Sequence, residues 1–345
     1  MSPAALLAVT AVAACLLVAP AGATAQPAED TRLSIAASGD LLIHTPVWRQ
    51  ALAHGDGRRY DFAPLFRKVR PLIAGADLAL CHVETPLTPG RPRSYPSFRT
   101  PVALAAGIRA TGWDVCSTAS NHTLDAGESG VRSTLEALKR NGVWRTGSYR
   151  KRSESLRPTI LEAKGVKVAF LSYTALTNGQ RARHSWMVNI ASPRRILREA
   201  ERARRAGADA VVVNMHWGDE YRSSPSPSQR SLAATVTRSE LITAVVGQHA
   251  HVVQPIRWIN GKPVVFGEGN LISDQSAACC TAASQDGLIA LIDLRVGASG
   301  VEATRVRYQP TYVRRSDYTV VRARGASRSR TIRVAGRSER VVPLP

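Results

Sequence analysis

The chain of 345 residues lacks several patterns that mark common classes of protein. After the first 25 residues, no segment reaches the ~18 consecutive apolar residues that a membrane-spanning helix needs. There is no CxxC pair, which argues against a cysteine-based zinc site. GxSxG, GxxxxGK[ST] and a complete GxGxxG are also absent, so a serine-hydrolase elbow, a P-loop and a dinucleotide-binding turn are not indicated.

Acidic residues are also scarce, since 26 of them face 46 basic residues and the net charge is +20. One interpretation is a polyanionic partner, such as an acidic wall polymer, an anionic membrane or nucleic acid. The alternative is a codon bias toward arginine that leaves only solvated surface charges. Nucleic acid is disfavoured because the basic residues are not interleaved with aromatic ones and because residues 1–25, described below, predict export.

The excess of arginine is greatest at the end of the chain. Nine arginines between Arg314 and Pro345 face only Asp317 and Glu339, and serine and glycine are frequent there. Such a composition predicts a flexible basic tail over residues 314–345.

The first 25 residues carry no charge and end in Ala-Thr-Ala before Gln26, which predicts a secretory signal peptide over residues 1–25. The run 12-VAAC-15 resembles a lipobox that would make Cys15 a lipid anchor, but the apolar run continues past Cys15 and favours an ordinary signal peptide. We therefore expect a secreted or cell-envelope-associated protein with no transmembrane helix in its mature chain.

Four cysteines remain after the predicted cleavage. Cys81 and Cys116 fall in apolar, strand-like runs, where a buried thiol is the usual state. The neighbouring Cys279 and Cys280 could be oxidised outside the cell, but the sequence does not determine any pairing.

Strand and helix patterns alternate along the chain and then give way to hairpins, which predicts a mixed α/β fold. An apolar run such as 210-AVVV-213 suits a central strand covered on both faces. The expected strands are 32–40, 77–84, 113–121, 209–218, 242–248, 287–296 and 301–313, with two strands within 158–172 that turn at Lys164-Gly165 and a hairpin over 252–266 that turns at Asn260-Gly261. Gly247 is expected to let the chain turn as it leaves strand 242–248, and in an extended segment the alternate residues His249 and His251 would face one site. The expected helices are 61–75, 101–112, 128–142, 193–207 and 228–238.

Polar side chains gather where these strands end. In α/β sheets, ligands bind at the carboxyl ends of strands, so we expect such residues to meet at one edge. A single histidine or aspartate at a strand end is usually a satisfied polar group, but six of the eight histidines lie in these clusters. The set is rich in oxygen and imidazole, which suits Mn, Zn, Fe or Ca. Its members are Asp40, Glu84, Asn121, His122, His216, His249 and His251.

At these residues the sequence resembles the CapA family of poly-γ-glutamate capsule synthesis proteins, within the calcineurin-like metallophosphoesterase superfamily. The resemblance covers roughly residues 33–296 and implies a domain over 26–313. It implies a four-layer αββα sandwich of two mixed sheets and a centre of two divalent metal ions. The matching segments are 38-SGDLLIH-44, 82-HVETPLT-88, 120-SNHTLDAGESG-130, 215-MHWGDEY-221, 247-GQHAHVVQPI-256 and 267-GEGNLISDQ-275.

The resemblance also implies a role for each site residue. Asp40 and His251 would bind the first metal, and Glu84 would stand at the bridging position. The second metal would be completed by Asn121, His216 and His249.

For catalysis, the resemblance implies that His122 protonates the leaving group. Asp125 is close enough in sequence to orient that ring. The chain departs from the family pattern in four ways. His82 and Ser120 each stand where the family commonly has asparagine, and the chain reads Gly-Gln-His-Ala-His over 247–251 where the family often reads Gly-His-His-Pro-His. His44 lies four residues after Asp40, so that it is not assigned as a ligand.

Two functions follow as hypotheses. The first is an exported metal-dependent hydrolase, phosphoesterase-like, whose substrate is a phosphoester or an acidic envelope polymer of capsule or cell-envelope metabolism. The second is a non-catalytic component that binds or exports an acidic polymer such as poly-γ-glutamate, with a capsule-synthesis membrane complex as partner. A degenerate fold without metal is the third alternative.

Overall fold

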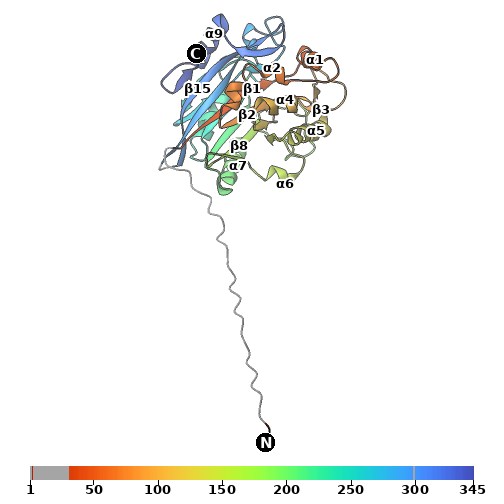
Figure 1. Cartoon of the computed structure of the whole chain (residues 1–345). Coiled ribbons are helices and arrows are strands. Elements are labelled where there is room, and N and C mark those ends of the chain that lie inside the picture. Colours follow the sequence, from red (N-terminus) through yellow and green to blue (C-terminus); the bar gives the residue numbers. More distant parts are fainter. Residues whose placement is uncertain (1, 3–30, 298–299) are drawn as a thin grey trace.

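The computed structural model describes residue 2, residues 31–297 and residues 300–345 (Figure 1). The predicted signal peptide over 1–25, with Cys15, lies outside the described residues apart from Ser2. Within the described part, no helix is both long and apolar enough to cross a membrane.

The first sheet is mixed and has nine strands among the described residues, in the order β16-β15-β14-β1-β2-β5-β6, with β13 beside β1 and β17 beside β15. β1, β2, β5 and β6 run parallel, and β14 runs antiparallel to β1. The strands are β1 (Arg32–Leu41), β2 (Leu78–Val83), β5 (Val115–Ser117), β6 (Trp144–Thr146), β13 (Asn270–Ile272), β14 (Asp286–Gly297), β15 (Gly300–Arg314), β16 (Thr319–Arg322) and β17 (Val341–Pro343).

The second sheet is also mixed, and its six strands follow the order β11-β12-β10-β9-β8-β7. The turns predicted at Lys164 and Asn260 are confirmed, because each residue and the glycine after it take positive φ, as a two-residue hairpin turn requires. The strands are β7 (Thr159–Ala163), β8 (Val166–Thr174), β9 (Ala210–His216), β10 (Ala244–Gln248), β11 (Ile256–Ile259) and β12 (Lys262–Val265); β3 (Leu87–Thr88) and β4 (Thr100–Pro101) form a separate pair.

The helices cover the outer faces of the two sheets, and the four-layer αββα arrangement is confirmed. One core lies between the sheets, a second lies under α1 to α5, and a third lies under α7 and α8. The helices are α1 (Thr45–His54), α2 (Ala63–Phe66), α3 (Arg70–Ala74), α4 (Leu104–Thr111), α5 (Gly127–Arg140), α6 (Arg152–Ser155), α7 (Pro193–Arg205), α8 (Pro227–Thr237) and α9 (Gly325–Ala335), with a 3₁₀ turn at Ala282–Gln285.

The two-residue period of β1 explains how one strand serves two cores. Ile35 and Ala37 face the core between the sheets, whereas Ala36 faces the helices. Because both faces are buried, apolar residues occupy consecutive positions from Ile35 to Ala37.

The single helix predicted over 61–75 is wrong, because the segment forms α2 and α3 with a turn between them. Pro71 has no amide hydrogen, so a continuous helix would lose the hydrogen bond to the carbonyl of Arg67. Each of the two short helices instead begins with a proline in its first turn.

The prediction of a flexible tail after residue 314 is also wrong. Residues 319–343 form β16, α9 and β17, and both strands pair with β15. Val320 joins the core under the helices, while Ala335 and Val341 join the core between the sheets. These few buried apolar residues tie down a segment whose composition is otherwise polar and basic.

The buried thiols expected at Cys81 and Cys116 are joined as a disulfide. The two residues lie directly opposite each other on the neighbouring strands β2 and β5. Cys279 and Cys280 form a second disulfide, between adjacent residues.

The end of β1 is shaped by a close approach of two backbones. A Cβ on Gly39 would lie 1.8 Å from the carbonyl oxygen of Gly269, so no other residue fits there. The next amide, that of Asp40, donates a hydrogen bond to the same carbonyl at 3.0 Å. Gly39 therefore lets β1 carry Asp40 to the edge of the sheet beside the loop that precedes β13.

Candidate metal centre

The carboxyl ends of β1 and β2 in one sheet face those of β9 and β10 in the other. Asp40 lies near the end of β1, Glu84 follows β2, His216 ends β9 and His249 follows β10. Each of these side chains belongs to a residue that is at most 3% exposed. The structure thus collects ionisable groups from both sheets in one buried place.

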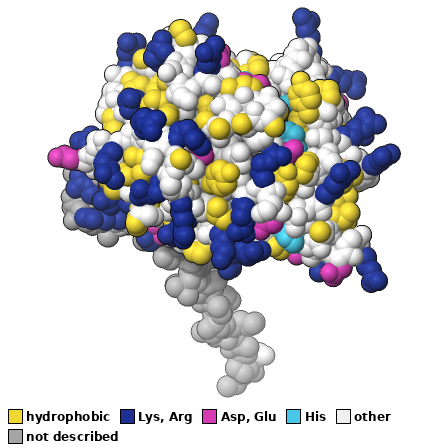
Figure 2. All heavy atoms as spheres, turned by 90° about the horizontal axis from the view of Figure 1, so that it is seen from above, with side chains coloured by type: hydrophobic (Ala, Val, Ile, Leu, Met, Phe, Trp, Pro, Cys, Tyr) yellow, Lys and Arg dark blue, Asp and Glu magenta, His cyan; other side chains and the backbone are white. Residues whose placement is uncertain are grey.

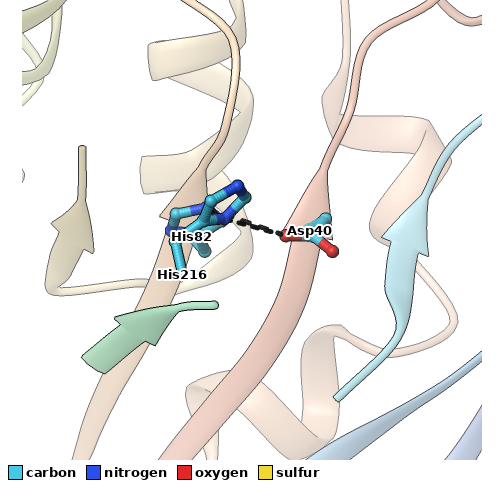
Figure 3. Close-up of side chains that lie close together, drawn as sticks. All are labelled: Asp40, His82 and His216. Carbon is cyan, nitrogen blue, oxygen red and sulfur yellow. Dashed lines mark hydrogen bonds and ion pairs between the residues drawn. The ribbon is translucent and has the colours of Figure 1, made fainter. Parts of the chain in front are cut away.

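Figure 3 shows Asp40, His82 and His216 on three different strands with their side chains directed toward one another. Oδ1 of Asp40 lies 3.7 Å from Nε2 of His82 and 3.9 Å from Nδ1 of His216. The two rings are joined by a 2.9 Å contact between His82 Nε2 and His216 Nδ1. These three residues could hold a metal ion, because their ligand atoms all lie within 4.8 Å of one another.

The residues assigned to the first metal also lie together. Asp40, Glu84 and His251 form a second group whose ligand atoms lie within 4.8 Å of one another. Nδ1 of His251 lies 3.3 Å from Oδ2 of Asp40, and its Nε2 lies 3.7 Å from Oε1 of Glu84. One ring therefore stands between the two carboxylates.

The residues assigned to the second metal are neighbours as well. Oδ1 of Asn121 lies 2.9 Å from Nε2 of His216. The rings of His216 and His249 are 4.6 Å apart, and Nδ1 of His249 has no hydrogen-bond partner among the described residues. Asn121 lies four residues beyond β5, not at the strand end that the sequence predicted.

The backbone at His249 and His251 differs from the prediction of an extended segment. Both residues are in the left-handed region, with φ of +91° and +55°. Such conformations cost about 1–2 kcal/mol each for residues with a side chain. The amide of His249 points at Asp40, 3.3 Å from Oδ2, so the distorted turn faces the carboxylate.

His122 and Asp125 form a pair at the border of this cluster. Nδ1 of His122 lies 2.8 Å from Oδ2 of Asp125. Asp125 also accepts hydrogen bonds from the amide of Phe98 at 2.7 Å and from Nε2 of Gln180 at 3.0 Å. The ring of Phe98 packs edge-on against His122, so the imidazole is held on two sides.

The pKa values of Asp40 and Glu84 are shifted in opposite directions. Burial and the neighbouring charge of Asp40 raise the pKa of Glu84 well above its ordinary value. Burial alone would raise the pKa of Asp40 too, but its hydrogen bond with His251 and the charges of three histidines lower it. Both oxygens of Glu84 lack a hydrogen-bond partner among the described residues.

Burial also changes the pKa values of the histidines. Burial lowers the pKa of His82 to about 4, and burial with the charge of His251 lowers that of His249 to about 3. Burial and the charge of His249 lower the pKa of His216 well below its ordinary value. For His251, the carboxylates Glu84 and Asp40 outweigh burial and raise the pKa to about 9. Most of these rings are therefore neutral near pH 7, the state in which imidazole binds a metal.

Three contributors to the centre were not assigned from the sequence. His82 contacts both Asp40 and His216, and Nδ1 of its own ring contacts the hydroxyl of Ser117 at 2.9 Å. Glu220 forms a third candidate group with His249 and His251. Asn270 places Oδ1 3.1 Å from Nδ1 of His251.

The signals for all three residues were present in the matching segments, since His82 begins HVETPLT, Glu220 lies in MHWGDEY and Asn270 lies in GEGNLISDQ. His44, which was not assigned as a ligand, packs against Phe98 and is in none of the candidate metal groups found in the described part of the chain.

The residues present fit divalent metal ions. The donors are carboxylate oxygens, an amide oxygen and imidazole nitrogens, which together suit Zn, Mn or Fe. A buried carboxylate without a partner is costly in a protein interior unless a cation neutralises it. The two oxygens of Glu84, which accept no hydrogen bond in the described structure and lie near Asp40 and His251, are such a place.

The comparisons with known proteins concern the same residues. Residues 34–275 match the family described as "Bacterial capsule synthesis protein PGA_cap". The chain is 27% identical over 258 residues to a capsule biosynthesis protein CapA of Bacillus anthracis, a match that covers 72% of this chain and 61% of that protein. It is 26% identical over 220 residues to a PGA biosynthesis protein CapA of Bacillus subtilis, covering 61% of this chain and 57% of the relative.

Two solved structures are similar at low sequence identity. The calcineurin-like phosphoesterase YfkN of Bacillus subtilis gives a TM-score of 0.48 at 14% identity, covering 88% of this chain and 96% of that one. A 5'-nucleotidase precursor of Thermus thermophilus gives a TM-score of 0.48 at 12% identity, covering 81% and 54%. The chain matches less than two thirds of the length of either CapA relative.

Proposed function

This chain belongs to the bacterial capsule synthesis protein family PGA_cap, and from that premise we propose that it is a metal-dependent hydrolase of the phosphoesterase type, acting in capsule or cell-envelope polymer metabolism. The substrate would be a phosphoester or an acidic envelope polymer. The export that residues 1–25 predict is part of the same proposal.

One observation carries the proposal: Glu84 is fully buried, neither of its oxygens has a hydrogen-bond partner in the described structure, and Asp40 and His251 stand beside it. Such a carboxylate suits a position between two cations. Asp40 and His251 would hold one ion on one side of Glu84. Asn121, His216 and His249 would hold the other. When bound, two divalent ions would polarise the scissile bond and stabilise the charge that develops on the attacking and leaving oxygens.

His122 would serve as the proton donor to the leaving group. Its Nδ1 is engaged by Asp125, so Nε2 is the nitrogen left to give or take a proton. Phe98 and Gln180 fix Asp125 by hydrogen bonds from the other side. The carboxylate therefore fixes the orientation of the ring, as in other histidines that move protons.

The test combines metal analysis with kinetics on the purified mature protein. We expect about two divalent ions per chain and turnover of a chromogenic phosphodiester. His122→Asn should lower kcat by about 10²–10⁴-fold while the metal content stays unchanged. The matched control is His184→Asn, which alters an exposed histidine outside the cluster and should not change the rate. Less than one ion per chain, or an unchanged rate in the His122 variant, would contradict the proposal.

A second function is favoured by the net charge of +20. In it, the chain binds or exports an acidic polymer such as poly-γ-glutamate without cleaving it, within a capsule-synthesis membrane complex. Salt-sensitive binding of the polymer without any shortening of it would favour this function, because exposed charges are screened by salt. Shortening of the polymer by the wild-type protein and not by His122→Asn would favour the hydrolase.

A further inference from the structure

A cavity of about 860 Å³ lies at the arginine-rich end of the chain, away from the residues of the metal centre. It is open to the surface and is bordered by the turn between α2 and α3, the end of β15, strand β16 and the start of α9. None of its lining residues in the described structure is acidic. Five of them are cations: Lys68, Arg314, Arg322, Arg324 and Arg330.

Two of the five cations are already neutralised within the protein. Arg314 pairs with Asp317 and Arg330 pairs with Asp286, each at 2.5 Å. In the part of the chain that the structure describes, the side chains of Lys68, Arg322 and Arg324 make no hydrogen bond or ion pair. Three like charges thus face one cavity without a counter-charge, and an anion placed among them would relieve their repulsion.

The pairs that hold Arg314 and Arg330 also fix the cavity in place. Asp286 begins β14 and accepts hydrogen bonds from both Arg330 and Ser327 of α9. This anchors the first turns of α9 to the sheet. The basic side chains of this segment are therefore carried by a folded frame and not by a flexible tail.

The cavity opens at the same edge of the first sheet as the metal centre. β14 runs antiparallel to both β1 and β15, so the carboxyl end of β15 lies at the edge where β1 carries Asp40. β16 is three strands away from β1, which corresponds to about 14 Å. Figure 2, seen from above this edge, shows Lys and Arg side chains spread widely over the face and far fewer acidic ones.

The lining also indicates the chemistry of the ligand. Two of the three uncompensated cations, Arg322 and Arg324, are arginines, whose planar guanidinium groups match carboxylates in pairs of hydrogen bonds. Tyr312, Val321 and Ala326 add apolar surface between the charges. A ligand with carboxylates separated by hydrocarbon fits both features better than a compact inorganic anion does.

We infer that this cavity is a second binding site, separate from the metal centre, that takes consecutive carboxylates of an acidic polymer. The inference rests on the proposed role in envelope polymer metabolism and not on hydrolysis. A polymer held here extends across the edge of the sheet toward Asp40.

The test measures binding of poly-γ-glutamate to the purified chain by calorimetry at low salt. The triple variant Lys68→Gln, Arg322→Gln and Arg324→Gln removes the three uncompensated charges and breaks no ion pair of the fold. We expect its affinity to be about ten-fold or more lower than that of wild type, with a weaker dependence on salt. The matched control is Arg58→Gln, Arg59→Gln and Arg238→Gln, which removes the same charge from exposed positions and should bind like wild type.

Equal weakening by the two triple variants, or no weakening by either, would overturn the inference in favour of a non-specific basic surface. Loss of binding to phosphatidylglycerol vesicles in the cavity variant, with polymer binding intact, would overturn it in favour of a membrane contact. Metal content and phosphodiester turnover are measured on the same samples. Failure of the hydrolase proposal and failure of the binding inference can therefore be distinguished, because turnover and polymer binding are measured separately.

Discussion

At the scale of single residues, the centre contains buried polar atoms that have no hydrogen-bond partner among the described residues. In the described structure, both buried oxygens of Glu84 and the buried Nδ1 of His249 lack a hydrogen-bond partner. By contrast, His82 contacts the ring of His216 and Asn270 contacts the ring of His251, so that each orients a neighbouring imidazole. Partners of this kind commonly change metal affinity by 10–100-fold when they are removed.

The first prediction concerns Glu84→Gln. Because burial disfavours the charged form of Glu84, the neutral and isosteric amide should leave the stability of the metal-free protein within about 1 kcal/mol of wild type, or raise it. The same change should abolish the stabilisation by added metal. Thermal unfolding with and without Mn²⁺ or Zn²⁺ measures both effects. Glu162→Gln, at an exposed position of β7, is the control, and a full metal response in Glu84→Gln would contradict the prediction.

A second residue-scale prediction concerns pH. Asp77 accepts hydrogen bonds from the amide of Ser34 and from Lys164, both at 2.8 Å. Burial would raise the pKa of Asp77, but the hydrogen bonds from Lys164 and Ser34 lower it below the ordinary 3.8. A lowered pKa in the fold contributes stability above the unfolded value, and this is lost as the pH falls through the folded value.

Asp77→Asn should therefore lower the free energy of unfolding at pH 7 by about 1 kcal/mol, a figure discounted because Lys164 is half-exposed. The difference should vanish as the pH falls below 3.8. Urea unfolding at pH 7, 5 and 3 measures this, with the exposed Asp56→Asn as control. A difference that persists unchanged at the lowest pH would show that the contacts of Asp77 do not depend on its charge.

At the scale of elements, the disulfide between β2 and β5 lies directly beside the centre. Cys81 precedes His82, and Cys116 precedes Ser117, whose hydroxyl contacts the His82 ring. The cross-link closes a loop with a sequence separation of 35 residues.

Cys81→Ala with Cys116→Ala should therefore lower the free energy of unfolding by about 4 kcal/mol, the entropy of closing such a loop. Denaturant unfolding of the oxidised protein and the double variant measures the difference. The vicinal pair Cys279→Ala and Cys280→Ala is the control, because its bond closes almost no loop. Equal stability of all three proteins would contradict this account.

The last segment of the chain gives the second prediction at this scale. Residues 319–343 should resist trypsin in the native protein despite their many arginines, because β16 and β17 pair with β15. Mass spectrometry of limited digests measures the cleavage sites. Rapid release of this segment from an otherwise intact protein would contradict the packed position of α9.

At the scale of the whole molecule, the centre joins the two halves of the sandwich. Asp40 and Glu84 come from one sheet, and His216 and His249 come from the other. Metal occupancy should therefore stabilise the whole domain, by about 2.7 kcal/mol when the free metal is 100 times its Kd. A single cooperative unfolding transition that moves to lower temperature with a chelator is expected. Two separate transitions, of which only one responds, would contradict this coupling.

Much of this architecture could be predicted from the sequence because the local signals agree with the fold. Alternating and apolar runs marked most strands of both sheets, and the turns at Lys164 and Asn260 have the geometry their sequences favour. The metal-centre cluster was assembled from strand ends by the rule for α/β sheets together with the family resemblance.

The rest depended on contacts between distant segments. Nothing local in the sequence shows that Val320 and Val341 bury against β15, or that Cys81 faces Cys116. The predicted backbone conformation of His249 and His251 was wrong, because an extended segment and a strained turn can both direct the rings of alternate residues to one place. Gly247 was expected to permit a turn, but it lies within β10, where a Cβ would be 2.1 Å from the oxygen of Phe266.

The contact between Gly39 and Gly269 has a consequence for mutation. A side chain at either position would collide with backbone atoms, and Gly269 in addition has a φ of +69°. Each glycine lies next to a residue of the cluster, namely Asp40 and Asn270. Missense changes can therefore inactivate the site at more positions than those of the metal ligands. Inherited variation at these two glycines is restricted by the shape of the backbone, although neither residue contributes a ligand atom.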